Sequence, residues 1–326
     1  MRVAEGVLTL PLVSSLTFLL WLFGSWQDVM LWATLAFVAV TAYLIVEWNN
    51  QCQLLRIRSR MNSVTFLTLT AIFPALHTQL WAFVPGFCLI AAYFILFKAY
   101  GQYRPEGYTF HAFLMISLGS LVYPPLLLLV PTLLVSSNVH LRVLTFRPLI
   151  AAILGLILPY WCYGAVALAR EYVVMYQFVD AAAIARWHMD ELTWSRWIDV
   201  YASFDALPDY SVLTLWQMVG LGFVLLLGLT GILHFMQTSY RNKISTREFY
   251  FSMRLQFLPL LAIVAWRPQD AVFTLPLLLT AVTPFAAHYL ALARSRTADR
   301  CFFLWLLAVI GVATANLLHW GGYGVM

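Results

Sequence analysis

The residues that suit chemistry on a large substrate are gathered in one polar segment, which runs from residue 170 to residue 209. Asp190 and Glu191 are adjacent there and His188 is close by. Carboxylates beside an imidazole are typical of a general base or of a site for a polar head group. Arg186 stands one helical turn before Asp190, a spacing that suits an ion pair, and it is also a candidate phosphate ligand. The segment is therefore the first place to expect a catalytic or binding site.

The same segment carries an aromatic stripe. No proline or glycine interrupts residues 178–201, and the aromatic residues recur at spacings that place them on one face of a helix. They are Trp187, Trp194, Trp197 and Tyr201. Such a helix fits the surface of a membrane, where tryptophan side chains anchor it. An interfacial anchor, a docking surface for a protein partner and a catalytic role for the neighbouring carboxylates all stay open.

Three short connections supply the other candidate residues. His77 and Gln79 stand in a short turn, at the level where a cavity would open. Arg267 is the preferred anion ligand, because an arginine at a membrane surface suits a phosphate; the alternative is a salt bridge with Asp270 in the same turn. Asp28 is the only acid of the first connection and is a further candidate for the catalytic base.

The elements that must position these residues are membrane-spanning helices. Hydrophobic residues make up 62% of the 326 residues and charged residues 10%, whereas a soluble domain has roughly 25% charged residues. A bilayer core about 30 Å thick needs roughly 20 apolar residues per helix, and such stretches follow one another almost end to end. We therefore predict an all-α fold, a polytopic transmembrane bundle of about eleven helices. The expected spans are 8–25, 29–47, 62–77, 80–98, 109–122, 124–138, 148–168, 211–235, 250–266, 271–293 and 302–319.

The polar segment divides the chain into three parts. We expect an N-terminal seven-helix membrane module at 1–168, an amphipathic loop at 169–209 and a C-terminal four-helix membrane module at 210–326. Most lysines and arginines lie in alternate connections, and such residues are retained on the cytoplasmic side of a bacterial inner membrane. With the N-terminus in the cytoplasm, the loop at 169–209 lies in the periplasm, together with the turns that hold Asp28, His77 and Arg267.

Several other classes of function lack a signal in the sequence. The four cysteines form no CxxC pair, and no HExxH, GxSxG or glycine-rich phosphate loop is present, so neither a metal site nor a cofactor is indicated. The net charge of +5 is accounted for by the basic connections, and we expect no nucleic-acid partner. No carboxylate lies deep inside a span, which disfavours proton-coupled transport. A transporter of small molecules or lipids, with His288 or Asn316 along its path, stays the third hypothesis.

Residues 62–164 carry a pattern of apolar runs punctuated by proline. It includes ISLGSLVYPP at 116–125, a basic loop that ends at Arg147, and LPYW at 158–161. In these features the stretch resembles the middle of the GT-C superfamily of polyprenyl-phosphate-sugar glycosyltransferases, in which a long outer loop also follows the seventh helix. The whole chain also resembles an uncharacterised Bacteroidota family of polytopic inner-membrane proteins, through LRIRSR at 55–60, SLVYP at 120–124 and the helix at 275–293.

The chain departs from the superfamily pattern in its outer connections. The superfamily carries its catalytic acid in a long first outer loop, whereas here that connection is short and has only Asp28. A second acid is usual in the next outer turn, where this chain has His77 and Gln79. The resemblance therefore implies either that the catalytic role has moved to Asp190 or Glu191, or that catalysis has been lost.

From these observations we expect an inner-membrane protein of cell-envelope biogenesis that handles a polyprenyl-phosphate-linked sugar at the outer leaflet, in contact with membrane lipid. The alternative is a non-catalytic subunit or scaffold that docks a periplasmic or membrane protein through the aromatic stripe. The first hypothesis requires a groove of lipid size with at least one of the candidate carboxylates inside it. The second requires the tryptophan face to stand above the membrane.

Overall fold

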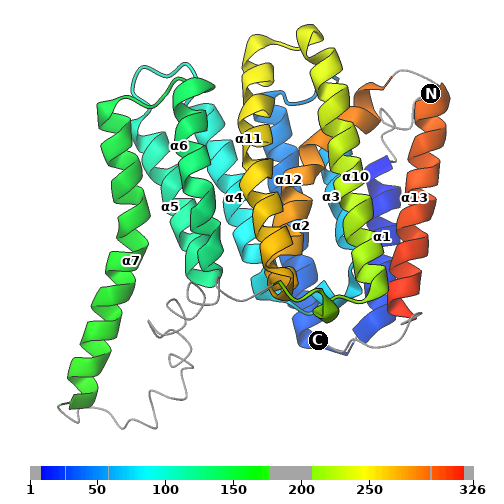
Figure 1. Cartoon of the computed structure of the whole chain (residues 1–326), viewed down its shortest axis with the longest axis horizontal. Coiled ribbons are helices and arrows are strands. Elements are labelled where there is room, and N and C mark those ends of the chain that lie inside the picture. Colours follow the sequence, from blue (N-terminus) through cyan, green and yellow to red (C-terminus); the bar gives the residue numbers. More distant parts are fainter. Residues whose placement is uncertain (1–8, 26, 58, 176–207, 294–295, 319–326) are drawn as a thin grey trace.

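The computed structural model describes residues 9–25, 27–57, 59–175, 208–293 and 296–318, which are largely helical (Figure 1). These ranges contain eleven α-helices and no strand, which confirms the predicted all-α class. Six of the helices are long and apolar enough to cross a membrane, as expected of a multi-pass membrane protein. The α-helices are α1 (Thr9–Ser25), α2 (Val29–Cys52), α3 (Met61–Thr70), α4 (Leu80–Lys98), α5 (Glu106–Val122), α6 (Val130–Val139), α7 (Phe146–Met175), α10 (Leu215–Thr238), α11 (Ile244–Trp266), α12 (Ala271–Leu292) and α13 (Arg296–Leu317).

Short 3₁₀ turns separate several of these helices. They are η2 (Pro74–Leu76), η3 (Pro124–Leu129), η6 (Tyr210–Val212), η7 (Ser239–Arg241) and η8 (Pro268–Asp270). Three of them begin with proline, which lacks the amide proton that a preceding helix would need and suits the first position of a new turn. Phe73, which precedes Pro74, is driven out of the helical region (φ −117°, ψ 83°). The span expected at 62–77 is therefore a helix that already ends at Thr70, followed by a turn.

Successive helices alternate in direction, so their connections lie at two ends of the bundle (Figure 1). We call the end with the α11–α12 turn the Arg267 end and the opposite end the basic end. The basic end holds the α2–α3, α4–α5, α6–α7 and α10–α11 connections, with Arg56, Arg60, Arg104, Arg142, Arg241 and Lys243. The charge asymmetry of the sequence is therefore an asymmetry between the two ends of the structure.

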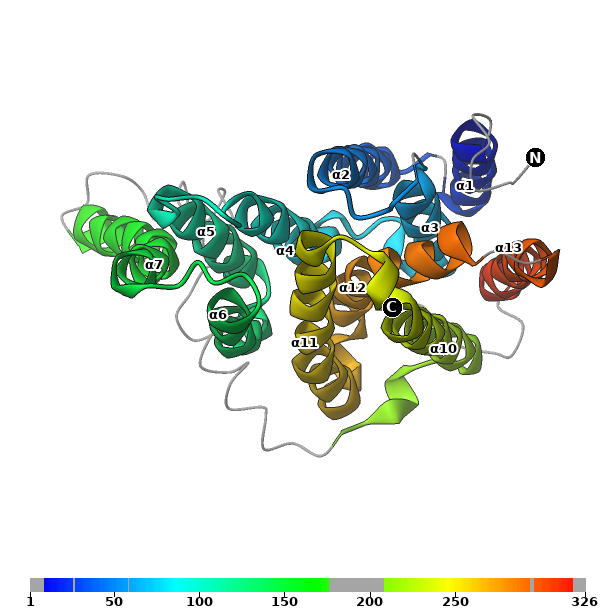
Figure 2. The same cartoon turned by 90° about the horizontal axis from the view of Figure 1, so that it is seen from above.

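Helix α12 lies at the centre of the bundle, with α3, α4, α10 and α11 around it (Figure 2). Small residues allow its neighbours to approach closely. Gly231 of α10 lies against the backbone of Phe285, where an added Cβ would come within 2.5 Å of the carbonyl group, and Gly86 of α4 lies against Thr280. Since α3 and α4 precede the polar segment and α10 to α12 follow it, both parts of the sequence contribute to one core.

Helix α7 lies at the edge of the bundle and packs along α5 (Figures 1 and 2). The contact is close: a Cβ added at Gly155 would lie 2.3 Å from the Phe110 carbonyl oxygen. The Ser117 hydroxyl of α5 also donates to the Leu156 carbonyl at 2.6 Å. The helix continues to Met175, so the end expected at residue 168 is too early, and the first polar residues after 168 belong to the helix.

Candidate functional site

The turn between α11 and α12 holds an ion pair in which the arginine is buried and the aspartate partly buried. Pro268 cannot continue α11, so the chain turns at Arg267 into η8. The Arg267 Nε donates to Asp270 Oδ2 at 2.6 Å, and Nη2 lies 3.4 Å from Oδ1. Only 5% of the Arg267 surface is exposed. The salt bridge that the sequence left as the alternative is thus formed, and any anion at this arginine has to share it with Asp270.

Tyr123 joins the same cluster from the other half of the bundle. Its hydroxyl lies 3.4 Å from Asp270 Oδ2, in position to donate to it. The Tyr123 ring stacks on Phe273 of α12, with centroids 5.3 Å apart and an angle of 7° between the planes. Burial, with the negative charge of Asp270 next in size, raises the pKa of Tyr123, so the phenol stays protonated and can act as a donor. The cluster therefore ties the end of α5 to the start of α12.

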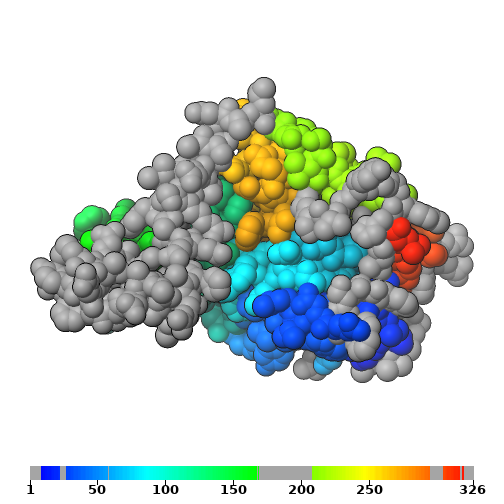
Figure 3. Space-filling model, turned by 90° about the horizontal axis from the view of Figure 1, so that it is seen from below, coloured from blue at the N-terminus to red at the C-terminus, as the bar shows by residue number. Residues whose placement is uncertain are grey.

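A small pocket, with free space for about one water molecule, lies beside this cluster, between α10, α11, η8 and α12. Leu213, Leu221 and Leu275 give it an apolar wall, and Gln217 and Thr274 are its polar residues. Seen from the Arg267 end, the segment around η8 (gold to orange) reaches the surface between α10 (yellow-green) and the α3–α4 region (cyan) (Figure 3). The arrangement places a charged cluster next to an apolar pocket, which suits an amphiphile with a polar head.

Local capping fixes the side of the pocket formed by α10. The Thr214 hydroxyl oxygen accepts from the Gln217 amide at 3.2 Å, and Gln217 Oε1 accepts from the Thr214 amide at 2.9 Å, which is a capping box. The Tyr210 hydroxyl donates to the Ala265 carbonyl at 2.6 Å and holds η6 against α11. These bonds set the position of Gln217 before any ligand arrives.

His77 is part of the packing between α1 and the α3–α4 connection. Its ring stacks on Trp21 with centroids 4.0 Å apart and an angle of 13°, and the residue is 2% exposed. Burial lowers the pKa of His77 to about 3, so the imidazole is neutral. A neutral ring stacked in the core is a poor ligand for an anion, which argues against the substrate-binding role predicted for His77. Gln79 lies just before α4 and is exposed.

Asp28 has a structural role in this fold. It is the N-cap of α2, and its carboxylate accepts from the Met30 amide at 2.8 Å. Such a bond satisfies one of the amide groups that every helix leaves unpaired at its start. The carboxylate predicted as a catalytic base is therefore already engaged in capping a helix.

The remaining candidates lie outside the residues that the structure describes. They are Arg186, Trp187, His188, Asp190, Glu191, Trp194, Trp197 and Tyr201. Catalysis by the carboxylates, phosphate binding by Arg186 and docking through the aromatic stripe stay predictions. Of the predicted site residues, the structure brings Arg267 together with Asp270 and adds Tyr123, which the sequence marked only as the residue before a pair of prolines.

A second polar cluster, at the basic end, was not predicted as a site. His234 Nδ1 and His288 Nδ1 lie 3.3 Å apart, and Asn242 Nδ2 lies 3.3 Å from His288 Nε2. The Asn242 amide nitrogen can only donate, so His288 Nε2 accepts from it. The remaining proton of the neutral His288 ring is then on Nδ1, which donates to His234 Nδ1. His288 is fully buried. The cluster joins α10 and α12 to the α10–α11 connection, which is the role of a structural cross-link.

Comparison of the chain with protein-family models, with curated proteins and with solved structures found no match. The resemblances to the GT-C superfamily and to the Bacteroidota family therefore stay predictions from the sequence. The functional argument rests on the geometry of the Arg267 end.

Proposed function

We propose that this multi-pass membrane protein binds an amphiphile with an anionic head group at its Arg267 end, and that the natural ligand is a polyprenyl-phosphate-linked glycan of the bacterial cell envelope. One observation carries the proposal: the buried cluster of Arg267, Asp270 and Tyr123 lies beside an apolar pocket. The charged cluster suits the phosphate, and the apolar residues around the pocket suit contact with the first part of the hydrocarbon chain. The sequence resemblance to polyprenyl-phosphate-dependent enzymes supports the choice of ligand.

The ion pair determines how an anion can bind at Arg267. The guanidinium group presents its N–H donors as a planar fork that matches the oxygens of a phosphate. Before binding, Asp270 compensates the buried charge of Arg267, which would otherwise be costly. A phosphate then replaces the Asp270 carboxylate at some of the Arg267 N–H donors. The Tyr123 hydroxyl continues to donate a hydrogen bond to the displaced carboxylate. In this proposal the Arg267 end faces the periplasm and the basic end the cytoplasm, as the charge asymmetry favours.

The test compares two ligands that differ only in the head group. The purified protein in detergent is titrated with a polyprenyl phosphate and with the polyprenol of the same chain length, and binding is followed by native mass spectrometry. The variant Arg267→Gln/Asp270→Asn removes both charges together, so that no buried carboxylate is left unpaired. We expect it to bind the phosphate about tenfold more weakly, because a charge-assisted hydrogen bond contributes about 1.5–3 kcal/mol.

The control is Arg104→Gln, which removes an exposed arginine at the opposite end. Its affinity for the phosphate should equal that of the wild type. Equal binding of polyprenol and polyprenyl phosphate would refute an anionic head-group site. So would an equal loss of affinity in both variants, because the loss would then not be specific to this cluster.

A further inference from the structure

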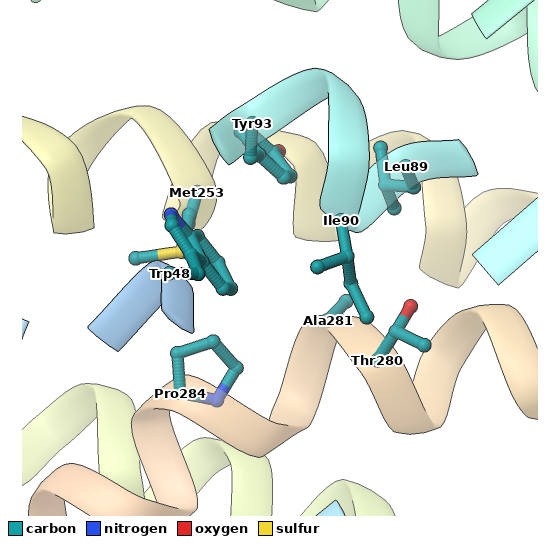
Figure 4. A pocket seen from close by; sticks show the side chains of 8 residues that line it. All are labelled: Trp48, Leu89, Ile90, Tyr93, Met253, Thr280, Ala281 and Pro284. Atoms are coloured by element: carbon teal, nitrogen blue, oxygen red, sulfur yellow. The ribbon is translucent and has the colours of Figure 1, made fainter. Parts of the chain in front are cut away.

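A second cavity lies inside the bundle, where α2, α4, α11 and α12 meet (Figure 4). The free space inside it is about that of one water molecule. Much of its wall is apolar, with Leu89, Ile90 and Met253 among the lining residues. No charged side chain is part of the lining that the structure describes. The cavity therefore excludes ions, which would need a charged or strongly polar partner in such surroundings.

Two aromatic residues of the lining have buried polar groups without partners. Trp48 is 2% exposed and Tyr93 is 4% exposed, and their rings stack with an angle of 10° between the planes. Among the described residues, neither the Trp48 indole N–H nor the Tyr93 hydroxyl has a hydrogen-bond partner. A buried donor that stays unpaired costs about 1–3 kcal/mol, and most such groups in proteins are satisfied by protein or by bound water.

At the same cavity, helix α12 has a carbonyl that lacks its usual helical donor. Pro284 has no amide proton, so the carbonyl of Thr280, one turn earlier, loses its donor within the helix. Both residues line the cavity. The Thr280 hydroxyl donates to the Leu277 carbonyl at 2.7 Å and does not replace that donor. In membrane helices, carbonyl groups freed by proline are satisfied by neighbouring groups or ordered water.

We propose that this cavity is a binding site for a small neutral hydroxyl group, supplied by a water molecule or by a lipid alcohol. A hydroxyl oxygen can accept a hydrogen bond from Tyr93 or Trp48, and its O–H group can donate one to the carbonyl of Thr280. In the second case the cavity admits only the hydroxyl group, and the carbon chain of the lipid alcohol would lie outside it. The site is independent of the Arg267 end, because it lies in the interior and shares no lining residue with the pocket there.

The test compares the direction in which the Tm changes when each of two buried tyrosines is replaced by phenylalanine. Tyr250 is fully buried, and its hydroxyl donates to the Pro284 carbonyl at 3.3 Å, so Tyr250→Phe removes a bond and lowers the Tm. If a hydroxyl occupies the cavity, Tyr93→Phe also removes a bond and lowers the Tm by a few degrees. If nothing accepts from Tyr93, the substitution relieves an unpaired buried group and raises the Tm. A raised Tm for Tyr93→Phe beside a lowered one for Tyr250→Phe would overturn the proposal.

Removal of lipid distinguishes the two sources of the hydroxyl. The melting curves are repeated after exhaustive exchange into lipid-free detergent. A decrease in Tm that persists in Tyr93→Phe assigns the site to water. A decrease that disappears, with loss of a retained lipid from the native mass spectrum of the wild type, assigns it to a lipid alcohol.

Discussion

Helices α7 and α12 are both apolar enough to cross a membrane, yet their surroundings are opposite. The mean hydropathy of their most apolar stretches is 1.9 for α7 and 1.5 for α12. In the folded protein, 83% of the α12 stretch is buried and only 17% of the α7 stretch. The more apolar helix is therefore at the edge of the bundle and the less apolar one at its centre.

The difference between them lies in how many sides are closely packed: among the described residues, α7 has a close glycine contact only toward α5, at Gly155, whereas α12 is packed by four helices. Lipid tails are as apolar as leucine, so hydrophobicity alone does not draw one helix against another inside a membrane. The centre of the bundle instead uses glycine at Gly86 and Gly231, and buried threonines such as Thr280 and Thr283 whose hydroxyls bond within their own helix. A central helix is recognised by small and internally satisfied residues, and a peripheral one by large apolar residues that face outward.

Truncation of the central helix is expected to have the largest effect. Leu278 is completely buried in α12, so Leu278→Ala removes packed methyl groups and leaves a cavity. The expected loss of stability is about 2–5 kcal/mol. Thermal unfolding in detergent measures it as a decrease in Tm. An unchanged Tm would show that α12 is not the packed centre that the structure describes.

The glycine of α10 that contacts α12 allows a sharper test, in which two glycine-to-alanine substitutions change the stability in opposite directions. Gly231→Ala places a methyl group against the Phe285 backbone and should cost about 1–3 kcal/mol through overpacking. Gly222 lies on the same helix with nothing within 4 Å of an added Cβ. Gly222→Ala should therefore raise the stability by about 0.5–1 kcal/mol, because alanine favours a helix. Equal effects of the two substitutions on the Tm would contradict close packing at Gly231.

Hydropathy predicted the order of the helices but not their positions in the bundle. Proline positions could have refined the boundaries, since Phe73 is extended because Pro74 follows it. The continuation of α7 to Met175 had no comparable signal, because Arg170 and Glu171 interrupt the apolar run. Whether a helix lies at the centre of the bundle depends on contacts between distant segments, such as Gly231 with Phe285. Hydropathy averaged along one helix carries no information about such contacts.

The candidate site shows the same limit. The salt bridge between Arg267 and Asp270 was predictable as an alternative, because the partners are three positions apart within one turn. The N-cap role of Asp28 was also open to prediction, since an aspartate directly before an apolar run is a helix start signal. Tyr123 was not, because its partner Asp270 is distant in the sequence and only the fold brings the two together.

The buried part of the bundle is also expected to respond to pH through His77. The folded protein keeps this imidazole neutral, because burial lowers its pKa to about 3, whereas the unfolded chain binds a proton below about pH 6.5. The stabilising contribution is thus present above about pH 6.5 and is lost as the pH falls toward 3. When the pH falls from about 7.5 to 5, the free energy of unfolding of the wild type should decrease by up to about 2 kcal/mol more than that of His77→Phe. This variant keeps an aromatic ring against Trp21. The same dependence of the Tm on pH in both proteins would contradict this role of His77.

The contact between α5 and α7 is expected to show a local effect. Gly155→Ala places a methyl group against the Phe110 carbonyl and should separate α7 from α5. Because α7 packs mainly on α5, hydrogen exchange of the α7 amides should increase while the Tm of the whole protein changes little. Gly107→Ala, on α5 with open space around it, serves as the control and should leave exchange in α7 unchanged. A fall in Tm as large as that of Gly231→Ala would mean that α7 belongs to the core.

The outward face of α7 should give the smallest effect of all. Trp161 is 71% exposed and Leu154 is 55% exposed, so Trp161→Ala and Leu154→Ala remove contacts with detergent or lipid and not with protein. Each should change the stability by about 0.5 kcal/mol or less, measured as Tm in the same detergent. A decrease comparable to that of Leu278→Ala would instead reveal a protein surface that covers this face. Truncation costs less stability on a face covered by lipid than on one covered by protein. Fluid hydrocarbon fills the space left by a truncated side chain, whereas close-packed protein relaxes only in part.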